Sequence, residues 1–154
     1  MAEFYASMQQ CLDVLLDHSS TLPPALLSTE IANFGHPTIL HQWAHMLSAE
    51  SSWVCGLQSL PRERIDPATL HTIEDVRAAR QKVRAATAAC LDSLTEERLN
   101  APLDRYPANW IGPHRPPAYI LLHVITHAFH HKGQMAAMLR LLGYPAPDTD
   151  MQRA

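Results

Sequence analysis

The sequence contains few glycines and few cysteines, and each low count limits the possible folds or types of site. Only 5 of its 154 residues are glycine, against 12 prolines, which favours long helices that end abruptly. The three cysteines, Cys11, Cys55 and Cys90, are odd in number and far apart, so they fit neither a disulfide framework nor a cysteine zinc site. We interpret them as small apolar side chains within helices.

Membrane and export signals are also missing. No apolar run approaches the roughly 18 residues that a membrane-spanning helix needs. The first residues, MAEFYASMQQ, lack the basic segment of a signal peptide. We therefore expect a cytoplasmic protein without a membrane partner.

The charge and the composition exclude two further classes. Apolar residues make up 47% of the chain, which excludes a disordered protein. The formal net charge of −3 argues against a nucleic-acid partner, and the basic residues from Arg77 to Arg84 are interpreted as a solvated helix face. The length predicts one domain, residues 1–154.

Apolar residues recur at three- and four-residue steps, the spacing of a buried helix face, in four segments: about 2–19, 37–57, 73–94 and 118–142. Pro23–Pro24 ends the first segment and Pro37 suits the first position of the second. Thr72 with Asp75 resembles a capping box, and Gly143 suits the end of the fourth helix. With no convincing pair of strands, the pattern predicts an all-α, up-down four-helix bundle.

Two stretches lie outside these helices. Residues 100–117 contain five prolines and are predicted to form an irregular loop. The last ten residues, 145–154, are predicted to be an extended strap.

Ten histidines are the most unusual feature of the composition, and four of them lie in HVITHAFHHKGQ on the last helix. A four-residue step turns a helix by only about 40°, so His123 with His127, or His127 with His131, could bind one metal ion. Both His127 and His131 lie in the middle of an apolar stripe about 80° wide. His123 lies at its edge and His130 outside it, which favours the pair His127 and His131.

The second helix offers His41 and His45, again four residues apart. His45 shares a side of the helix with small residues such as Ala49 and Ser52, which indicates either an exposed face or the wall of an open pocket. The spacing alone leaves the third metal ligand undecided between His41 and His45. Glu50 is an acid on the otherwise apolar buried face.

The last helix and tail resemble the DinB/YfiT-like metalloprotein superfamily. That family's usual text is H-V-[VI]-x-H-x-x-x-H-[RK]-G-Q followed by A-A-x-L-R-x-L-G, and HVITHAFHHKGQMAAMLRLLGYPAPDTDM matches it closely. The second helix, HMLSAESSWVCGL, is similar to the family's pattern of a histidine, four residues, an acid, two residues and a tryptophan.

The resemblance implies a four-helix bundle that holds a divalent metal ion through three histidines. By motif position these are His45, His127 and His131. Three imidazoles leave at least one coordination position open, which is typical of a catalytic site. Imidazole suits several metals, and we expect zinc or nickel.

The family includes thiol-dependent transferases or isomerases and metal-dependent hydrolases. We expect a transferase in which a low-molecular-weight thiol, bound as thiolate, attacks a small electrophile. The alternatives are a hydrolase with a metal-bound water and a non-catalytic metal-binding bundle. Members also resemble dimers, so a homodimer is an expectation.

Two further sets of residues are candidates around such a metal. The electrophile is expected against an aromatic wall formed by Trp53, Trp110 or Tyr119. Positioning and proton-transfer roles are expected among four polar residues: His41, His123, His130 and Glu50.

Overall fold

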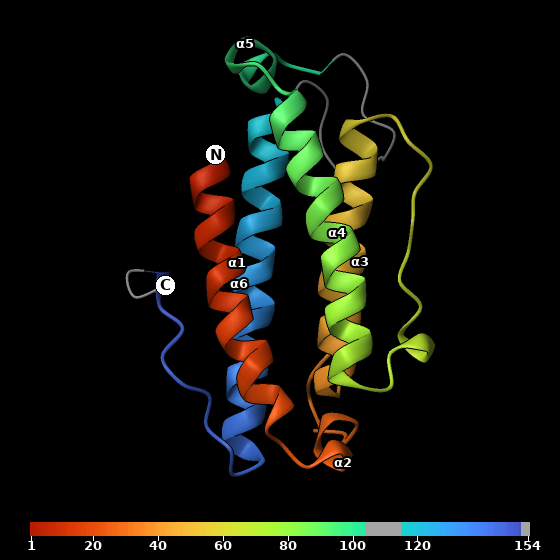
Figure 1. The fold of residues 1–154 in the computed structure, drawn as a ribbon, viewed down its shortest axis with the longest axis vertical. Coiled ribbons are helices and arrows are strands. Elements are labelled where there is room, and N and C mark those ends of the chain that lie inside the picture. The colour runs from red at the N-terminus through yellow and green to blue at the C-terminus, as the bar shows by residue number, and fades with distance from the viewer. Residues whose placement is uncertain (104–114, 152–154) are drawn as a thin grey trace.

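Four long helices make up a computed structural model of the chain, which describes residues 1–103 and 115–151 (Figure 1). They are α1 (Ala2–Ser20), α3 (Ile39–Leu57), α4 (Ile73–Ser93) and α6 (Pro117–Leu141). Three short helical segments join them: α2 (Pro24–Leu27), the 3₁₀ turn η1 (Pro67–Thr69) and α5 (Glu96–Asn100). The described residues contain no strand, which confirms the all-α bundle.

The ends of the helices differ from the prediction in small ways that side-chain capping explains. α3 begins at Ile39 rather than at Pro37, because the Thr38 hydroxyl accepts a hydrogen bond from the His41 amide at 3.0 Å. Pro24 opens α2 instead of only ending α1. Thr72 and Asp75 form the predicted capping box of α4. Residues 104–114, within the predicted proline-rich loop, lie outside the described residues.

The connection between α3 and α4, residues 58–72, determines the direction of the helices. It leaves the end of α3 and returns along the outside of the bundle to the opposite end, so α3 and α4 run in the same direction (Figure 1). Its contacts show the same path, since Arg62 bonds to Ser52 and Ile65 bonds to Ser48. α1 and α3 are therefore antiparallel, and so are α4 and α6, whereas α3 and α4 are parallel.

The packing of the four helices places α1 and α3 at diagonal corners. Each of these two helices contacts both α4 and α6. Large apolar side chains fill the centre, among them Met8, Leu12, Trp43 and Met135, all fully buried. From α3, apolar side chains such as Trp43, Met46 and Leu47 join this core, while small residues on another side of the helix line the pocket described below.

The tail after α6 runs back beside the bundle, as a strap would. The Lys132 ammonium donates to the Thr149 carbonyl at 2.6 Å, and His18 lies 3.3 Å from the Tyr144 carbonyl. Within the described part of the chain, no helix has both the length and the apolarity needed to cross a bilayer.

Candidate metal centre

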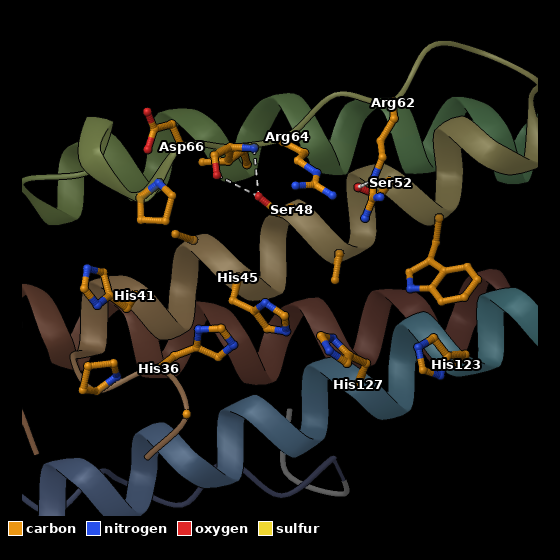
Figure 2. A pocket seen from close by; sticks show the side chains of 17 residues that line it. His36, His41, His45, Ser48, Ser52, Arg62, Arg64, Asp66, His123 and His127 are labelled. Atoms are coloured by element: carbon orange, nitrogen blue, oxygen red, sulfur yellow. Dashed lines mark hydrogen bonds between the residues drawn. The ribbon is translucent and has the colours of Figure 1, made fainter. Parts of the chain in front are cut away.

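The side of α3 that carries small residues forms the wall of a pocket of about 960 Å³ (Figure 2). Ala44, Ser48 and Ser52 line it at four-residue steps, and Ala49 lines it beside them. Their short side chains leave space between α3, α6 and the 58–72 connection. Of the two interpretations of this face left open by the sequence, the structure shows the pocket wall.

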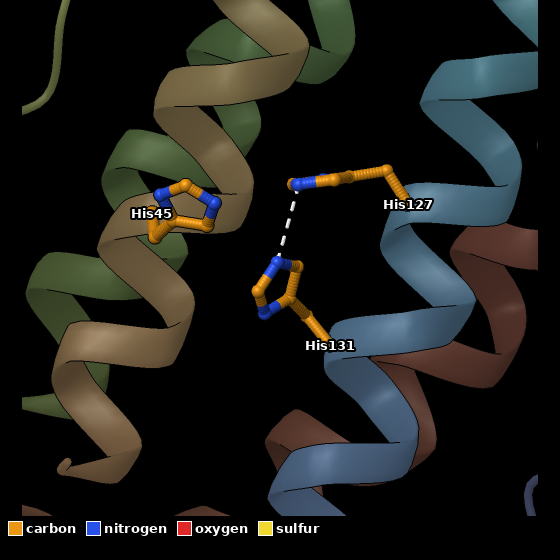
Figure 3. Close-up of side chains that lie close together, drawn as sticks. All are labelled: His45, His127 and His131. Carbon is orange, nitrogen blue, oxygen red and sulfur yellow. Dashed lines mark hydrogen bonds between the residues drawn. The ribbon is translucent and has the colours of Figure 1, made fainter. Parts of the chain in front are cut away.

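Three histidines lie together where this pocket meets α6. One ring nitrogen from each of His45, His127 and His131 lies within 4.8 Å of the other two (Figure 3). The ring centroids of His127 and His131 are 4.4 Å apart, and that of His45 lies 4.7 Å from His131. We call these three residues the histidine cluster.

The four-residue step along α6 is what brings His127 and His131 together. Their Nε2 atoms are 3.2 Å apart, so both point at nearly the same place. His131 is buried with 3% exposure, whereas His45 and His127 are half-buried and line the pocket. The cluster is therefore anchored in the core and reached from the pocket.

Gln42, one turn before His45 on α3, determines which nitrogen of His131 carries the hydrogen. The Gln42 side-chain amide donates from Nε2 to the His36 carbonyl at 2.8 Å, which leaves its Oε1 as an acceptor. The Nδ1 of His131 lies 2.7 Å from that oxygen and donates to it. The lone pair of neutral His131 is therefore on Nε2, the atom that faces His127.

The histidines of the cluster are neutral at physiological pH. Burial, with the neighbouring imidazoles, lowers the pKa of His127 to about 4 and that of His131 to about 3. Burial also lowers the pKa of His45, with a smaller effect from His36. Neutral imidazole is the form that binds metal ions, so protons compete weakly for these nitrogens.

The donor set fits a divalent transition metal. Nitrogens that share a tetrahedral zinc ion at about 2.0–2.1 Å lie roughly 3.4 Å apart. The 3.2 Å between the two α6 nitrogens is close to that value, and His45 is within reach of both. The Gln42 contact matches the way a metal-binding histidine is usually held through its other nitrogen.

Of the other predicted polar candidates, two line the pocket and one lies on the surface. His41 and His123 line it, and the His123 ring lies 4.8 Å from the ring of Trp53, edge to face. His130 is exposed and contacts Gln134 at 3.0 Å.

Glu50 is buried away from the pocket, on the other side of α3. The Tyr5 hydroxyl donates to its Oε1 at 2.6 Å and the Thr87 hydroxyl donates to the same oxygen at 2.8 Å. Burial raises the pKa of the Glu50 carboxyl. We call Glu50, Tyr5 and Thr87 the acid cluster; it links α3 to α1 and α4 and does not contact the histidine cluster.

The three aromatic candidates have different positions. Trp53 lines the pocket and is buried with 8% exposure. Tyr119 is exposed, with the Arg115 guanidinium 4.7 Å from its ring centre. Trp110 lies outside the described residues.

Sequence reasoning did not single out two residues that border the cluster. The His36 ring stacks on that of His45, with centroids 3.8 Å apart and an angle of 22° between planes. His36 lies before α3, so helical spacing gave no signal for it. Gln42 was detectable in principle, as a glutamine on a helix face that it shares with Met46 and Trp53.

Comparisons with known proteins give one consistent result. The model of the DinB family matches residues 1–154. The chain is 26% identical over 141 residues to the protein named DinB of Bacillus subtilis (strain 168), covering 84% of this chain and 78% of that protein. The crystal structure of a DinB-like protein from Bacillus cereus has the same fold, with a TM-score of 0.73, 22% identity and 94% of each chain covered.

Proposed function

The chain belongs to the DinB family, and we propose that it is a divalent-metal-dependent enzyme that acts on a small molecule. The observation that carries this proposal is the position of the histidine cluster at the wall of the 960 Å³ pocket. A structural site is enclosed by its ligands, whereas His45 and His127 face a space of the size that small-molecule ligands occupy.

The reaction that we propose is transfer of a low-molecular-weight thiol to a small electrophile. A zinc or nickel ion held by His45, His127 and His131 would stabilise the thiolate form of the thiol. The sulfur forms a bond to an electrophilic carbon, the leaving group departs with its electron pair, and the proton of the thiol passes to solvent. In an isomerase the sulfur would add to the substrate and leave again.

Different residues around the pocket would have different roles in this reaction. Gln42 orients His131 through its Nδ1 hydrogen. Trp53 and Ala49 supply an apolar wall beside the cluster, against which an electrophile can pack and be shielded from water. His41 and His123 line the same pocket. Either could pass the proton of the thiol to solvent.

Metal content is the first test of the proposal. Mass spectrometry of untagged, chelator-free protein should find about one zinc or nickel ion per chain, and the His127→Ala/His131→Ala variant should have lost it. His130→Ala is the matched control, since His130 is an exposed histidine beside His131, and it should keep the metal. Absence of metal after reloading with zinc or nickel would contradict an enzyme of this kind.

The thiol is tested on protein loaded with cobalt or nickel. A thiol such as 2-mercaptoethanol should produce a sulfur-to-metal charge-transfer band that is missing in the double variant. An unchanged spectrum at millimolar thiol would refute the transferase. Turnover of an ester in thiol-free buffer, rising through a pKa near 7, would then identify a hydrolase. Metal that affects only stability would identify a non-catalytic bundle.

A further inference from the structure

The pocket has a second wall, formed by the connection between α3 and α4, and hydrogen bonds fix this wall to the helix. The Ser48 hydroxyl donates to the Ile65 carbonyl at 2.9 Å and accepts from the Ile65 amide at 2.8 Å. One turn further along α3, the Arg62 guanidinium donates from Nε to the Ser52 hydroxyl at 2.8 Å. The backbone at Ile65 and the side chain of Arg62 are therefore held against α3 at the pocket.

Two of these side chains are arginines. Arg62 and Arg64 line the same pocket as His45 and His127. Figure 2 shows both guanidinium groups extending from the connection across α3, with the imidazoles on the other side of the pocket. We call Arg62 and Arg64 the arginine pair.

The charges around the pocket are not balanced. Among the described residues that line it, Asp66 is the one carboxylate, and its Oδ1 accepts from the Ala68 amide as the cap of η1. Among these described lining residues, two arginines therefore stand beside one carboxylate, and a divalent ion at the cluster would add further positive charge.

Arg64 differs from the arginines of α4. Arg77, Arg80 and Arg84 bond to Asp17 or Asp13 of α1 and have a structural role between the two helices. In the described part of the chain, no hydrogen bond or ion pair joins Arg64 to another residue. Arg64 lies between the pocket and a smaller cavity of about 370 Å³ beside α4, so it borders two open spaces.

Arginine binds carboxylates and phosphates through two parallel hydrogen bonds, which a lysine cannot form. We propose that the arginine pair binds the anionic group, a carboxylate or phosphate, of the small molecule that occupies this pocket. The position of the reacting atom, at the histidine cluster, rests on the proposed function; the binding of the anion does not. The substrate class is then a small molecule with an anionic end and a reactive end.

Two thiols that differ in charge test this inference on the cobalt-loaded protein. Mercaptosuccinate has two carboxylates and 2-mercaptoethanol has none. The charge-transfer band should titrate at about 10- to 100-fold lower concentration with mercaptosuccinate, because charge-assisted hydrogen bonds have that effect on affinity. In Arg64→Ala this preference should fall, and in Arg62→Ala/Arg64→Ala it should disappear, with the 2-mercaptoethanol titration unchanged.

The control variants separate charge from fold. Arg140→Ala removes an exposed arginine at the end of α6, outside the pocket, and should keep the full preference. Arg64→Lys keeps the charge but loses the two-bond geometry, so it should fall between wild type and Arg64→Ala. Equal affinity for the two thiols in the wild type, or a preference that survives the double substitution, would overturn the proposal.

A second measurement keeps the two proposals distinguishable. Calorimetric titration with succinate, which has no thiol, should show binding to the metal-loaded wild type that Arg62→Ala/Arg64→Ala loses. Succinate binding without any thiol band would support the anion site and refute the thiol transferase. A thiol band without arginine-dependent binding of succinate or mercaptosuccinate would refute the anion site and leave the transferase standing.

Discussion

α3 carries a polar cluster on each of two sides, and the two clusters are built in opposite ways. In the acid cluster, the Glu50 carboxylate is met by hydroxyl donors from Tyr5 and Thr87 on two other helices. In the histidine cluster, three groups of one kind meet each other. The acid cluster lies in the packed interior, whereas His45 and His127 of the histidine cluster line a pocket.

The contrast shows how a structural polar group differs from a candidate site. The Glu50 carboxyl accepts both hydrogen bonds on Oε1 from hydroxyl groups of the fold, so its partners are supplied by the packed interior. Three neutral imidazoles at contact distance offer more lone pairs than hydrogens to one another. A cation satisfies all of these lone pairs at once, and the pocket gives it access.

The largest expected difference between the clusters is in the effect of metal on stability. An ion present at 1,000 times its Kd stabilises the folded state by about 4 kcal/mol. Chelation should lower the free energy of unfolding of the wild type by that order and leave His127→Ala/His131→Ala unaffected. Denaturant unfolding with and without chelator measures it, and Tyr5→Phe, which alters only the acid cluster, should keep the full response. A wild type indifferent to chelator would contradict the distinction.

A fall in pH should change the stability contributed by the two clusters in opposite directions. In the metal-free protein, His131 has a folded pKa of about 3, below its value of about 6.5 when unfolded. The unfolded state then binds more protons, so stability is lost as the pH falls below 6.5, by about 3 kcal/mol at pH 4.5 for this residue. The Glu50 pKa is raised, so the acid cluster instead loses stability as the pH rises through that pKa.

Unfolding midpoints at several pH values, measured on chelated protein, test this difference. His131→Leu should show a smaller loss of stability between pH 6.5 and 4.5 than the wild type. Glu50→Gln should show a greater relative stability at high pH than at low pH. Parallel pH profiles for the wild type and both variants would mean that neither cluster titrates as described.

The fold was largely predictable because apolar spacing and capping are local signals. The positions of all four long helices and the capping box of Thr72 and Asp75 followed from residues within a few turns of one another. The direction of α4 was not predictable in that way. It depends on where the 58–72 connection lies, and hydrogen bonds such as that between Ser48 and Ile65 form only once α3 is already in place.

The residues of the candidate site also differ in whether local spacing could predict them. His127 and His131 share one helix face, so periodicity alone selected them, while His45 needed the resemblance to the DinB/YfiT-like superfamily. The position of Glu50 on a buried helix face was predictable from spacing. Its partners were not, because Tyr5 and Thr87 lie 45 and 37 residues away in the sequence. Arg62 and Arg64 had no periodic signal, because they lie in an irregular segment.

The smallest expected effects come from removing a buried hydrogen-bonding side chain beside each cluster. Tyr5→Phe deletes the 2.6 Å bond to Glu50, and Gln42→Met deletes the 2.7 Å bond to His131 together with the bond to the His36 carbonyl. Each should lower the free energy of unfolding of the metal-free protein by about 1–3 kcal/mol, since each leaves a buried polar group with one partner fewer. On stability alone the two clusters should therefore look alike.

Metal affinity should tell the two variants apart. Gln42→Met releases the ring of His131 from its orientation, and loss of such a contact typically weakens metal binding by about 10- to 100-fold. Tyr5→Phe should leave the metal Kd unchanged, because Tyr5 contacts no residue of the histidine cluster. Competition titration against a chromophoric chelator measures both. An equal loss of affinity in the two variants would mean that the bundle transmits strain between the two sides of α3, and the clusters would then be one coupled site.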